Sequence, residues 1–330
     1  MPIKDKPIAL NVLITSLSKK IPLIRAVRNA LERIDPEAHL IGGDIDGKCI
    51  GRYFVDGFWK MPPANELSAE DVVGFCRDKR ICAIIPTRDG ELEFFAGNKS
   101  LFDAAGISVM IASLHSVRSC IDKWSFYEAL KDKPGVNLIP VKGEPDCASG
   151  KRWVVKERYG AGSKNVCIDL SADAARQAAN RFETPIFQPY IDGLEYSIDV
   201  YINRARKPKG CIVRTRDVVK QGESQVTTTV EHKNIADTCL AAAGHLSLTG
   251  HMVFQAIEDF SGSIHLMECN SRFGGASTLS IAAGLDSFYW FFREGLGDDL
   301  GDVAFVESPG DLRQVRYAAD KIIAVPGRQG

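Results

Sequence analysis

The first hundred residues alternate short apolar runs with amphipathic stretches, and this alternation limits the folds available to the chain. Residues 9–15 (ALNVLIT) and 39–44 (HLIGGD) have the composition of short strands, and residues 81–87 (ICAIIPT) are almost continuously apolar, as in a buried parallel sheet. Between them, apolar residues recur at helical spacing after Pro22, and Ser68 precedes an acidic first helical turn. The pattern predicts a doubly wound α/β lobe.

Ligands of such a lobe bind outside the carboxyl ends of its strands. Four polar residues fall at these ends: Thr15, Asp44, Thr87 and Asp89. They are candidates for substrate binding, although ordinary turn residues would stand at the same places. A dinucleotide-binding lobe would carry G-x-G-x-x-G after its first strand, where residues 15–20 read TSLSKK. NAD binding in that mode is therefore not expected.

Composition and charge exclude several classes of protein. At 330 residues the chain is too long for one compact core, and 45% hydrophobic with 25% charged residues is typical of a globular protein. Lys plus Arg number 41 against 42 Asp plus Glu, so we expect no surface-wide basic footprint for nucleic acid or anionic membrane. Nine cysteines without a C-x-x-C pair favour reduced thiols. Without a signal peptide or membrane-length apolar run, we expect a cytoplasmic protein.

After about residue 113 the pattern changes from alternating elements to neighbouring strands. The expected elements are a helix over 116–131, a strand over 153–156, a helix over 171–182, strands near 186–191, 195–202 and 210–219, a helix near 234–247, and strands over 251–258 and 263–270. The strand spacing predicts antiparallel pairing. No internal repeat or long linker separates the parts, so we expect packed lobes.

The strongest local motif lies in the last of these strands, HLMECNSR. Side chains two residues apart share a face of a strand, so Glu268 and Asn270 project together and Met267 and Cys269 point to the opposite face. Two oxygen ligands at a strand end suit Mg²⁺, which prefers a few protein oxygens plus water and phosphate. We expect the Cys269 thiol to point into the core.

The preceding strand carries Gln255 between apolar neighbours. A turn over 259–263 would fold this strand back so that Gln255 approaches Glu268. An acid among apolar residues is costly unless it is paired or binds metal. Spacing alone leaves two interpretations open, a structural ion pair and a metal site.

Two further segments carry candidate chemistry. Lys156 precedes a glycine-rich loop over 158–164 (RYGAGSK), whose backbone N–H groups could wrap an anion, although a plain hairpin turn has the same composition. The lysine precedes the glycines, so the loop lacks the Walker pattern. In the segment 188–195 (QPYIDGLE), Pro189 suits a connection between lobes, and the backbone after it could pair with a purine edge.

Together these stretches resemble the ATP-grasp superfamily, and most closely single-module relatives of the carbamoyl-phosphate synthase large subunit. The resemblance begins with NVLITS at 11–16, IPTRDGEL at 85–92 and IDK at 121–123. It continues in order with the lysine and glycine loop, the acidic hinge, a basic strand and Glu-x-Asn-x-Arg. The fold that it implies is an N-terminal doubly wound parallel-sheet lobe (1–113) followed by two α+β subdomains clasping ATP, a small lobe (114–187) and a large lobe with C-terminal segment (188–330).

The resemblance also implies roles for individual residues. Those expected to contact ATP are Lys123, Lys156, Gly160, Ala161, Gly162, Ser163, Gln188, Tyr190, Ile191 and Glu195. Those expected to organise Mg²⁺, with Mn²⁺ as a substitute, are Gln255, Glu268 and Asn270. Those expected to act on the phosphoryl group are Arg214, Arg216 and Arg272. Without the resemblance, Arg214 and Arg216 would be interpreted as a solvated strand face.

The sequence departs from the superfamily pattern at three positions. Pro189 stands where relatives often have an acid, which leaves one contact to the adenine amine open. Ser271 stands where proline is frequent before the arginine. Gln255 replaces a carboxylate ligand of many members, and a neutral amide binds Mg²⁺ more weakly, so the binding of a second ion stays open.

The implied activity is that of an ATP-dependent carboxylate–amine ligase. It would act through an acyl phosphate on a small-molecule carboxylate and amine and release ADP and phosphate. A homodimer is the default expectation. One alternative is a bicarbonate-phosphorylating enzyme similar to carbamoyl-phosphate synthase, although a single nucleotide module argues against the complete synthase reaction. The other is a non-catalytic ATP-binding regulatory module.

Overall fold

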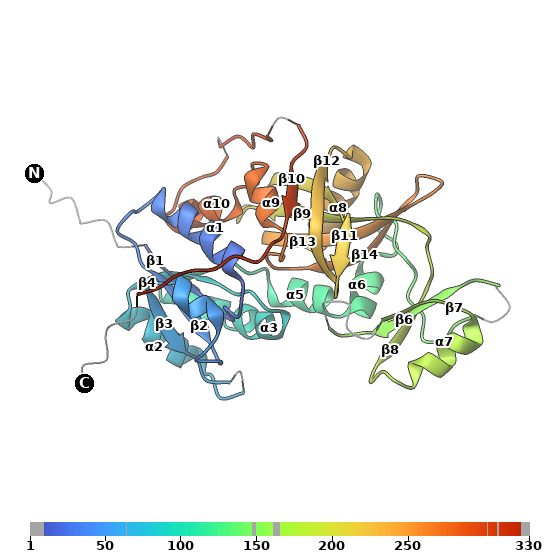
Figure 1. The fold of residues 1–330 in the computed structure, drawn as a ribbon, viewed down its shortest axis with the longest axis horizontal. Coiled ribbons are helices and arrows are strands. Elements are labelled where there is room, and N and C mark those ends of the chain that lie inside the picture. The colour runs from blue at the N-terminus through green and yellow to red at the C-terminus, as the bar shows by residue number, and fades with distance from the viewer. Residues whose placement is uncertain are drawn as a thin grey trace, which may run out of the picture.

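The computed structural model describes residues 10–63, 65–146, 150–160, 166–301, 303–308 and 310–324. Three sheets follow one another along the long axis of the molecule, with the N-terminal sheet at one end and the smallest sheet at the other (Figure 1). The first sheet is parallel and the other two are antiparallel. The expected mixed α/β fold is confirmed.

The N-terminal lobe is a five-stranded parallel sheet in the order β3-β2-β1-β4-β5. Its elements are β1 (Asn11–Ile14), α1 (Ile21–Glu32), β2 (Leu40–Asp44), the 3-10 helix η1 (Ile50–Phe54), β3 (Gly57–Lys60), α2 (Ala69–Asp78), β4 (Ile81–Ile85), α3 (Asp89–Gly97), α4 (Lys99–Ala104) and β5 (Ser108–Val109). Leu13 packs with α2 and α3, whereas its neighbours Val12 and Ile14 pack with α1. Helices therefore cover both faces, as the alternation of strands and helices predicts.

Between the lobes, the single helix expected over 116–131 is wrong. The segment forms two helices, α5 (Leu114–Ile121) and α6 (Lys123–Leu130), separated by Asp122 in an extended conformation. The Asp122 carboxylate accepts hydrogen bonds from the backbone N–H groups of Trp124 at 2.9 Å and Ser125 at 3.3 Å. Aspartate is a strong N-cap, so it starts a new helix here and gives Lys123 a fixed position.

The small sheet contains β6 (Trp153–Glu157), β7 (Val166–Leu170) and β8 (Pro185–Pro189) in the order β7-β6-β8. Helix α7 (Ala172–Ala179) packs against it and is capped by Ser171, as expected. A small core of its own, centred on Trp153 and Phe187, holds this unit together.

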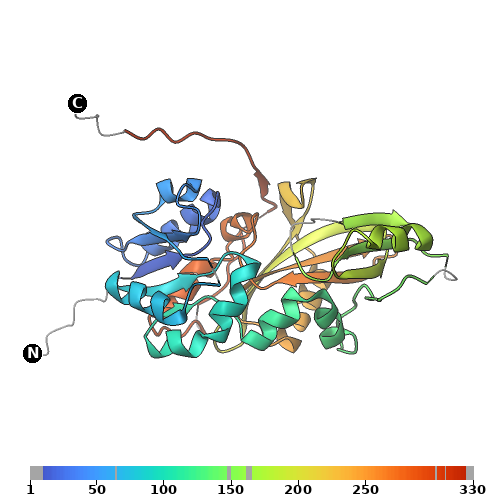
Figure 2. The same ribbon diagram turned by 90° about the horizontal axis from the view of Figure 1, so that it is seen from below.

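The large sheet has seven strands, ordered β11-β12-β10-β9-β13-β14 with β15 paired to β12. Its strands are β9 (Gly193–Ile202), β10 (Pro208–Thr215), β11 (Val218–Lys220), β12 (Glu223–Val230), β13 (Gly250–Asp259), β14 (Ile264–Asn270) and β15 (Arg313–Val315), and its helices are α8 (Lys233–His245), α9 (Thr278–Ala282) and α10 (Ser287–Gly295). The strand expected over 210–219 is two strands, and β12 and β15 were not predicted. After β15 the chain runs back toward the N-terminal lobe (Figure 2), where the Lys321 ammonium donates to the Tyr53 carbonyl oxygen at 2.7 Å.

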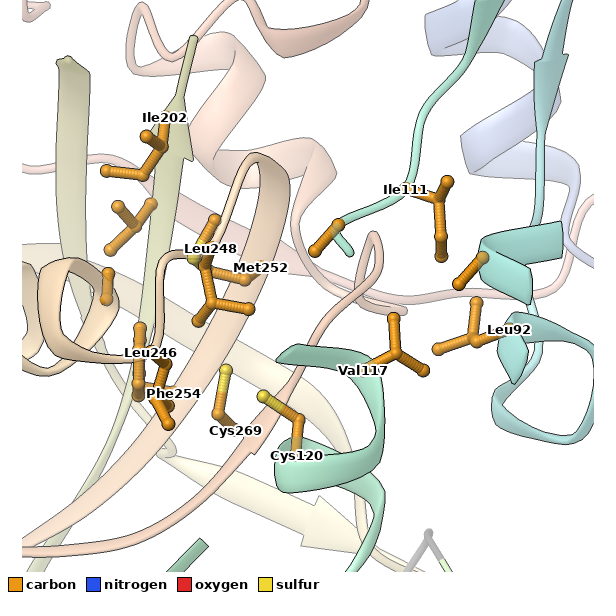
Figure 3. Close-up of a cluster of buried hydrophobic side chains, with 14 of the residues drawn as sticks. Leu92, Ile111, Val117, Cys120, Ile202, Leu246, Leu248, Met252, Phe254 and Cys269 are labelled. Carbon is orange, nitrogen blue, oxygen red and sulfur yellow. The ribbon is translucent and has the colours of Figure 1, made fainter. Parts of the chain in front are cut away.

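The main core joins α5, α8 and the large sheet (Figure 3). Cys269 lies in it beside Cys120, and burial raises the pKa of the Cys269 thiol. The expected inward orientation of Cys269 is therefore confirmed. The eight cysteines in the described ranges are all free. None of the helices described is long and apolar enough to cross a membrane.

Candidate functional site

Two adjoining cavities lie along the large sheet, and the first of them lies between the small and large sheets. The first has a volume of about 600 Å³, within the range of about 300–1,000 Å³ usual for small-molecule sites. Ten sequence-predicted residues line it: Lys123, Lys156, Gly160, Gln188, Tyr190, Ile191, Glu195, Arg216, Gln255 and Glu268. The fold thus gathers residues separated by up to 145 positions along the chain.

The second cavity is smaller, about 180 Å³. It shares Arg216, Gln255 and Glu268 with the first cavity, so the two are neighbours. Its other predicted lining residues are Arg214, Asn270 and Arg272. Ala161, Gly162 and Ser163, expected to cover the nucleotide, lie outside the described residues.

Two lysines supply positive charge to the first cavity. Lys123 is buried at the start of α6, and its ammonium donates to the Gly160 carbonyl oxygen at 2.7 Å and lies 3.9 Å from a Glu268 carboxylate oxygen. Removal from water lowers the pKa of Lys156 to about 8, although Glu268 opposes this shift. A bound polyanion would stabilise both ammonium groups in their charged form.

The position of Lys123 depends on the helix break before it. Arg158 donates two hydrogen bonds to the Asp122 carboxylate, at 2.7 and 2.5 Å. Burial alone would raise the pKa of Asp122, but the bonds from Arg158 and Ser125 lower it to about 2. This charged pair joins the residue that directly follows β6 to the start of α6, so Lys123 and Lys156 face one cavity.

The first cavity also has apolar lining residues, among them Ile139, Val154 and Ile257. Gln188 is buried and donates to the Ile139 carbonyl oxygen at 3.2 Å. The Tyr190 backbone N–H donates to the Arg152 carbonyl oxygen at 2.9 Å, so this N–H group already has a partner within the protein.

Met267 also lines this cavity, which corrects its predicted place on the face opposite Glu268. The pairing of β13 with β14 shifts by one residue between Gln255 and Ala256. A bulge of this kind re-aims the side chains beside it, so that Met267 and Glu268 reach the same cavity. Strict strand alternation could not reveal the bulge.

The expected oxygen ligands come together. Gln255 and Glu268 are direct partners across β13 and β14, and the Asn270 amide lies 3.4 Å from a Glu268 carboxylate oxygen. No group of three His, Cys, Asp or Glu side chains suited to a metal occurs in the described ranges. An all-oxygen set with one carboxylate fits Mg²⁺ bound together with phosphate oxygens, because Mg²⁺ usually keeps several non-protein ligands.

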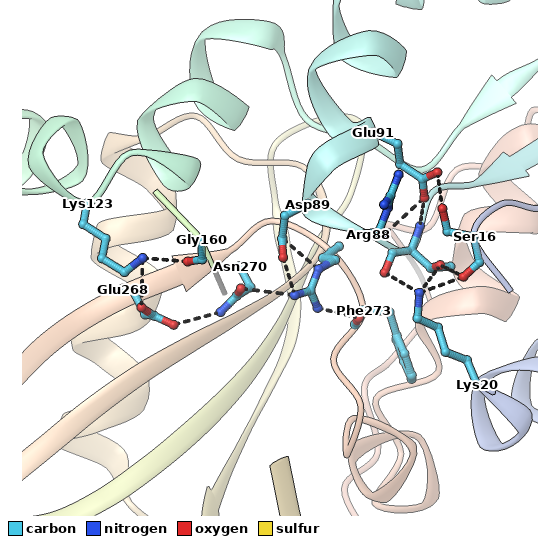
Figure 4. Close-up of polar contacts among 12 residues, drawn as sticks. Ser16, Lys20, Arg88, Asp89, Glu91, Lys123, Gly160, Glu268, Asn270 and Phe273 are labelled. Carbon is cyan, nitrogen blue, oxygen red and sulfur yellow. Dashed lines mark hydrogen bonds and ion pairs between the residues drawn. The ribbon is translucent and has the colours of Figure 1, made fainter. Parts of the chain in front are cut away.

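The arginines of the second cavity are each held by an acid. Arg272 donates two hydrogen bonds of 2.7 Å to Asp89 at the start of α3 (Figure 4). Arg214 is 2% exposed and lies 2.6 Å from Asp199. Arg216 is 3.1 Å from Glu195, the residue expected at the ribose. The alternative of a solvated strand face for Arg214 and Arg216 is wrong, because their side chains are only 2% and 7% exposed.

Behind Arg214 lies a polar network that sequence reasoning missed. Asp199 is fully buried, accepts from Ser280 at 2.7 Å and lies 3.0 Å from His251. Burial alone would raise the pKa of Asp199, but Arg214 and His251 hold it well below its usual range. Nothing in the spacing of these residues indicates that they meet. Arg316, a further lining residue of the second cavity, was also missed.

The polar residues at the strand ends of the N-terminal lobe bond mostly within that lobe, and Figure 4 shows the contacts of Ser16, Lys20 and Glu91 there. The Thr87 hydroxyl donates to the Thr15 carbonyl oxygen at 2.6 Å, and Asp44 accepts from the Ser18 backbone at 2.8 Å. Lys20 donates to Thr87, and burial lowers the pKa of Lys20 to about 8. Of the four predicted residues, Asp89 lines a small cavity together with Lys123 and Glu268, and it also holds Arg272 of the second cavity.

Two parts of the chain match known protein families. Residues 181–318 match the family described as ATP-grasp in the biosynthetic pathway with Ter operon, and residues 12–110 match the PylC-like N-terminal domain. Among curated proteins, none matches the chain.

Solved structures share the fold at low identity. The biotin carboxylase domain of Hydrogenobacter thermophilus 2-oxoglutarate carboxylase, a dimer with MgADP, ADP and bicarbonate, has a TM-score of 0.70 at 17% identity, covering 92% of this chain and 73% of that one. L-amino acid ligase from Bacillus licheniformis has a TM-score of 0.66 at 16% identity, covering 88% and 75%. N5-carboxyaminoimidazole synthetase from Staphylococcus aureus has a TM-score of 0.66 at 12% identity, covering 91% and 80%. The chain therefore combines a PylC-like N-terminal domain with an ATP-grasp domain.

Proposed function

We propose that this protein is an ATP- and Mg²⁺-dependent ligase that joins a carboxylate to an amine. The observation that carries the proposal is the pair of adjoining cavities, one lined by lysines and the other by arginines, with Gln255 and Glu268 in the wall between them. The fold similarity to an L-amino acid ligase supports the same reaction class. Transfer of a phosphoryl group depends mainly on positioning and on neutralising charge, and this arrangement supplies both.

In this proposal the first cavity binds ATP. The apolar end around Val154 and Ile257 receives adenine, Glu195 holds the ribose, and Lys123 and Lys156 contact the phosphates. Gln255, Glu268 and Asn270 would hold Mg²⁺, which when bound neutralises charge on the phosphate oxygens. Mn²⁺ would serve the same ligand set.

The second cavity would hold the acid. A carboxylate oxygen of the acid attacks the γ-phosphorus, the bond from that phosphorus to the ADP oxygen breaks, and ADP leaves. The amine nitrogen then attacks the acyl carbon, inorganic phosphate leaves, and the nitrogen loses a proton. Arg272, fixed by Asp89, would hold the reacting carboxylate in line, and Arg216 would balance charge on the transferred group.

We also propose the lobe limits 1–113, 114–187 and 188–330. The parallel sheet ends at Val109 and α5 begins at Leu114, which supports the first limit. The chain passes from the small sheet to the large sheet between Pro189 and Gly193, a few residues after the second limit, which lies inside β8. A homodimer is part of the proposal, in line with the dimeric Hydrogenobacter domain.

The test is Mg²⁺-dependent ADP release with a panel of small carboxylic acids, each offered with a panel of amines. We expect release with at least one acid and loss of release in Lys123→Met. Lys99→Met, which changes an exposed lysine paired with Asp103 on α4, is the matched control and should retain activity. No release with any acid, despite tight MgADP binding, would favour the non-catalytic module instead.

A second candidate, bicarbonate phosphorylation, is favoured by the fold similarity to a domain solved with bicarbonate. The same assay separates the two. Release stimulated by bicarbonate alone supports the second candidate, whereas release that requires an organic acid supports the ligase.

A further inference from the structure

One wall of the second cavity is formed by Arg316, which the C-terminal segment carries into place. Strand β15 pairs with β12 through Val226 and Val315, and the Arg316 backbone N–H donates to the Gln225 carbonyl oxygen at 2.9 Å. The Arg316 side chain is 21% exposed, so most of it is enclosed. Arg316 therefore belongs to a C-terminal segment that lines the cavity and follows all the other strands of the large sheet in the sequence.

The opposing backbone leaves room for this side chain. A Cβ atom at Gly275 would lie 2.8 Å from the Arg316 Nη2 atom. Gly275 does not have a positive φ. The conformation of its backbone therefore does not require glycine, and the missing side chain is what admits the guanidinium.

The bonds of the Arg316 guanidinium are incomplete. Its Nη1 atom donates to Glu223 at 2.7 Å, and its buried Nε atom has no hydrogen-bond partner among the described residues. Glu223 is 56% exposed, so solvent screens this pair and it holds Arg316 only weakly. A guanidinium has five N–H donors, so Arg316 retains capacity for an anion.

The other cations of the second cavity are already assigned. Arg214 is held by buried Asp199, and Arg216 lines both cavities and pairs with Glu195. Arg272, fixed by Asp89, is placed at the reacting carboxylate in the proposed function. Arg316 has no role in that reaction, although it faces the same cavity.

We propose that Arg316 binds a second anionic group of the acceptor acid, one that is not phosphorylated. This inference rests on the proposed ligase function and narrows its substrate to a small acid with two anionic groups. The cavity of about 180 Å³ suits a molecule of that size. Arginine matches a carboxylate with two parallel hydrogen bonds, which gives selectivity for such a group.

The experiment compares dicarboxylic acids with their monoamides, such as succinate with succinamate and glutarate with glutaramate, in Mg²⁺-dependent ADP release. The wild-type protein should prefer the acid with two charges. Arg316→Gln should raise the KM for the dicarboxylic acid by about 10–100-fold, the loss expected for one hydrogen-bonded charged contact. The KM for the monoamide should not change. Gly275→Ala keeps the charge but displaces the guanidinium, so it should weaken the same preference.

The matched control is Arg313→Gln. Arg313 lies on β15, three residues before Arg316, but its side chain is 64% exposed and bonds to Thr228 outside the cavity. The preference for the dicarboxylic acid should therefore persist in this variant. Equal kcat/KM values for diacids and monoamides in the wild type would overturn the inference and leave the ligase function standing. An equal effect of Arg316→Gln on both would do the same. No ADP release with any acid would overturn the proposed function, and the inference with it.

Discussion

The two cavities share a wall but differ in the cations that line them. The larger one carries Lys123 and Lys156, whereas the smaller one carries only arginines as its basic residues. An ammonium is a compact point charge that adapts to a flexible polyphosphate, while a guanidinium is a planar fork that fits a carboxylate in one geometry. In the proposed function, the larger cavity would therefore recognise ATP by charge and the smaller one the acceptor acid by shape.

The two cavities also differ in how firmly the charge of their cations is fixed. Burial lowers the pKa of Lys156 to about 8, so Lys156 loses its charge as the pH rises past that value. The arginine charges are permanent, and Asp89 and Asp199 fix two of them. The lysine charge of the first cavity therefore varies with pH, whereas the arginine charges of the second do not.

The largest expected effect comes from replacing Asp199, which holds Arg214 in the wall of the second cavity. Asp199→Asn leaves Arg214 buried without a counter-charge and should lower the free energy of unfolding by about 3–5 kcal/mol. Urea unfolding followed by circular dichroism measures this, with Asp237→Asn, in an exposed pair with Lys233, as control. MgADP affinity should not change in the folded variant. A loss equal to that of the control would show that Arg214 needs no buried partner.

The next effect comes from the shared wall. Glu268→Gln should lower ADP release by about 10²–10³-fold, the usual loss when a positioned electrostatic group is removed. Both MgADP affinity and acceptor turnover should fall, because Glu268 lines both cavities. Glu128→Gln, in an exposed pair with Lys131 on α6, should be neutral. An effect on only MgADP affinity or only acceptor turnover would show that Glu268 serves one cavity and not both.

Lys156→Met should weaken MgADP binding by about 10–50-fold, as expected for one charged contact, with Lys233→Met as exposed control. The pKa of Lys156 is about 8 in the folded protein, against the usual lysine value of 10.5. The unfolded chain thus binds more protons between these values, and the free energy of unfolding rises with pH over that window. Lys20 adds a rise of the same sign. Unfolding at pH 8–10 should show a flatter rise in Lys156→Met, and an unchanged slope would contradict the assignment.

The smallest effect concerns the link between the lobes. Asp89→Asn frees Arg272, and the pair is partly exposed, so we expect only about a 3–10-fold rise in acceptor KM with unchanged MgADP affinity. The control is Glu93→Gln, because Glu93 lies on the same helix as Asp89 and forms an exposed pair with Arg118. If Asp89→Asn changed nucleotide binding instead, Arg272 would belong to the first cavity.

Sequence reasoning succeeded where local pattern decides structure. The alternation before residue 110 predicted the parallel sheet, and the two-residue spacing of Glu268 and Asn270 predicted that they meet. The ordered motifs predicted ATP-grasp, which the family matches confirm. These features repeat at short range, so no knowledge of the tertiary structure is needed.

The rest depends on contacts distant in the chain or on local irregularities. Asp89 meets Arg272 across 183 positions, and Arg316 enters the cavity because β15 pairs with β12, a strand that the sequence did not reveal. The bulge that turns Met267 into the first cavity leaves no mark in the alternation of side chains. The break at Asp122 was visible as a strong capping residue, but the apolar spacing around it suggested one helix.

The segment from Asn137 to Lys142 bonds to both antiparallel sheets. At one end Leu266 exchanges hydrogen bonds with Asn137 and Ile139, and at the other Lys142 exchanges them with Phe187. The segment therefore joins the two antiparallel sheets through backbone hydrogen bonds at both of its ends. A displacement of the small sheet along β14 would break the hydrogen bonds at one of these ends.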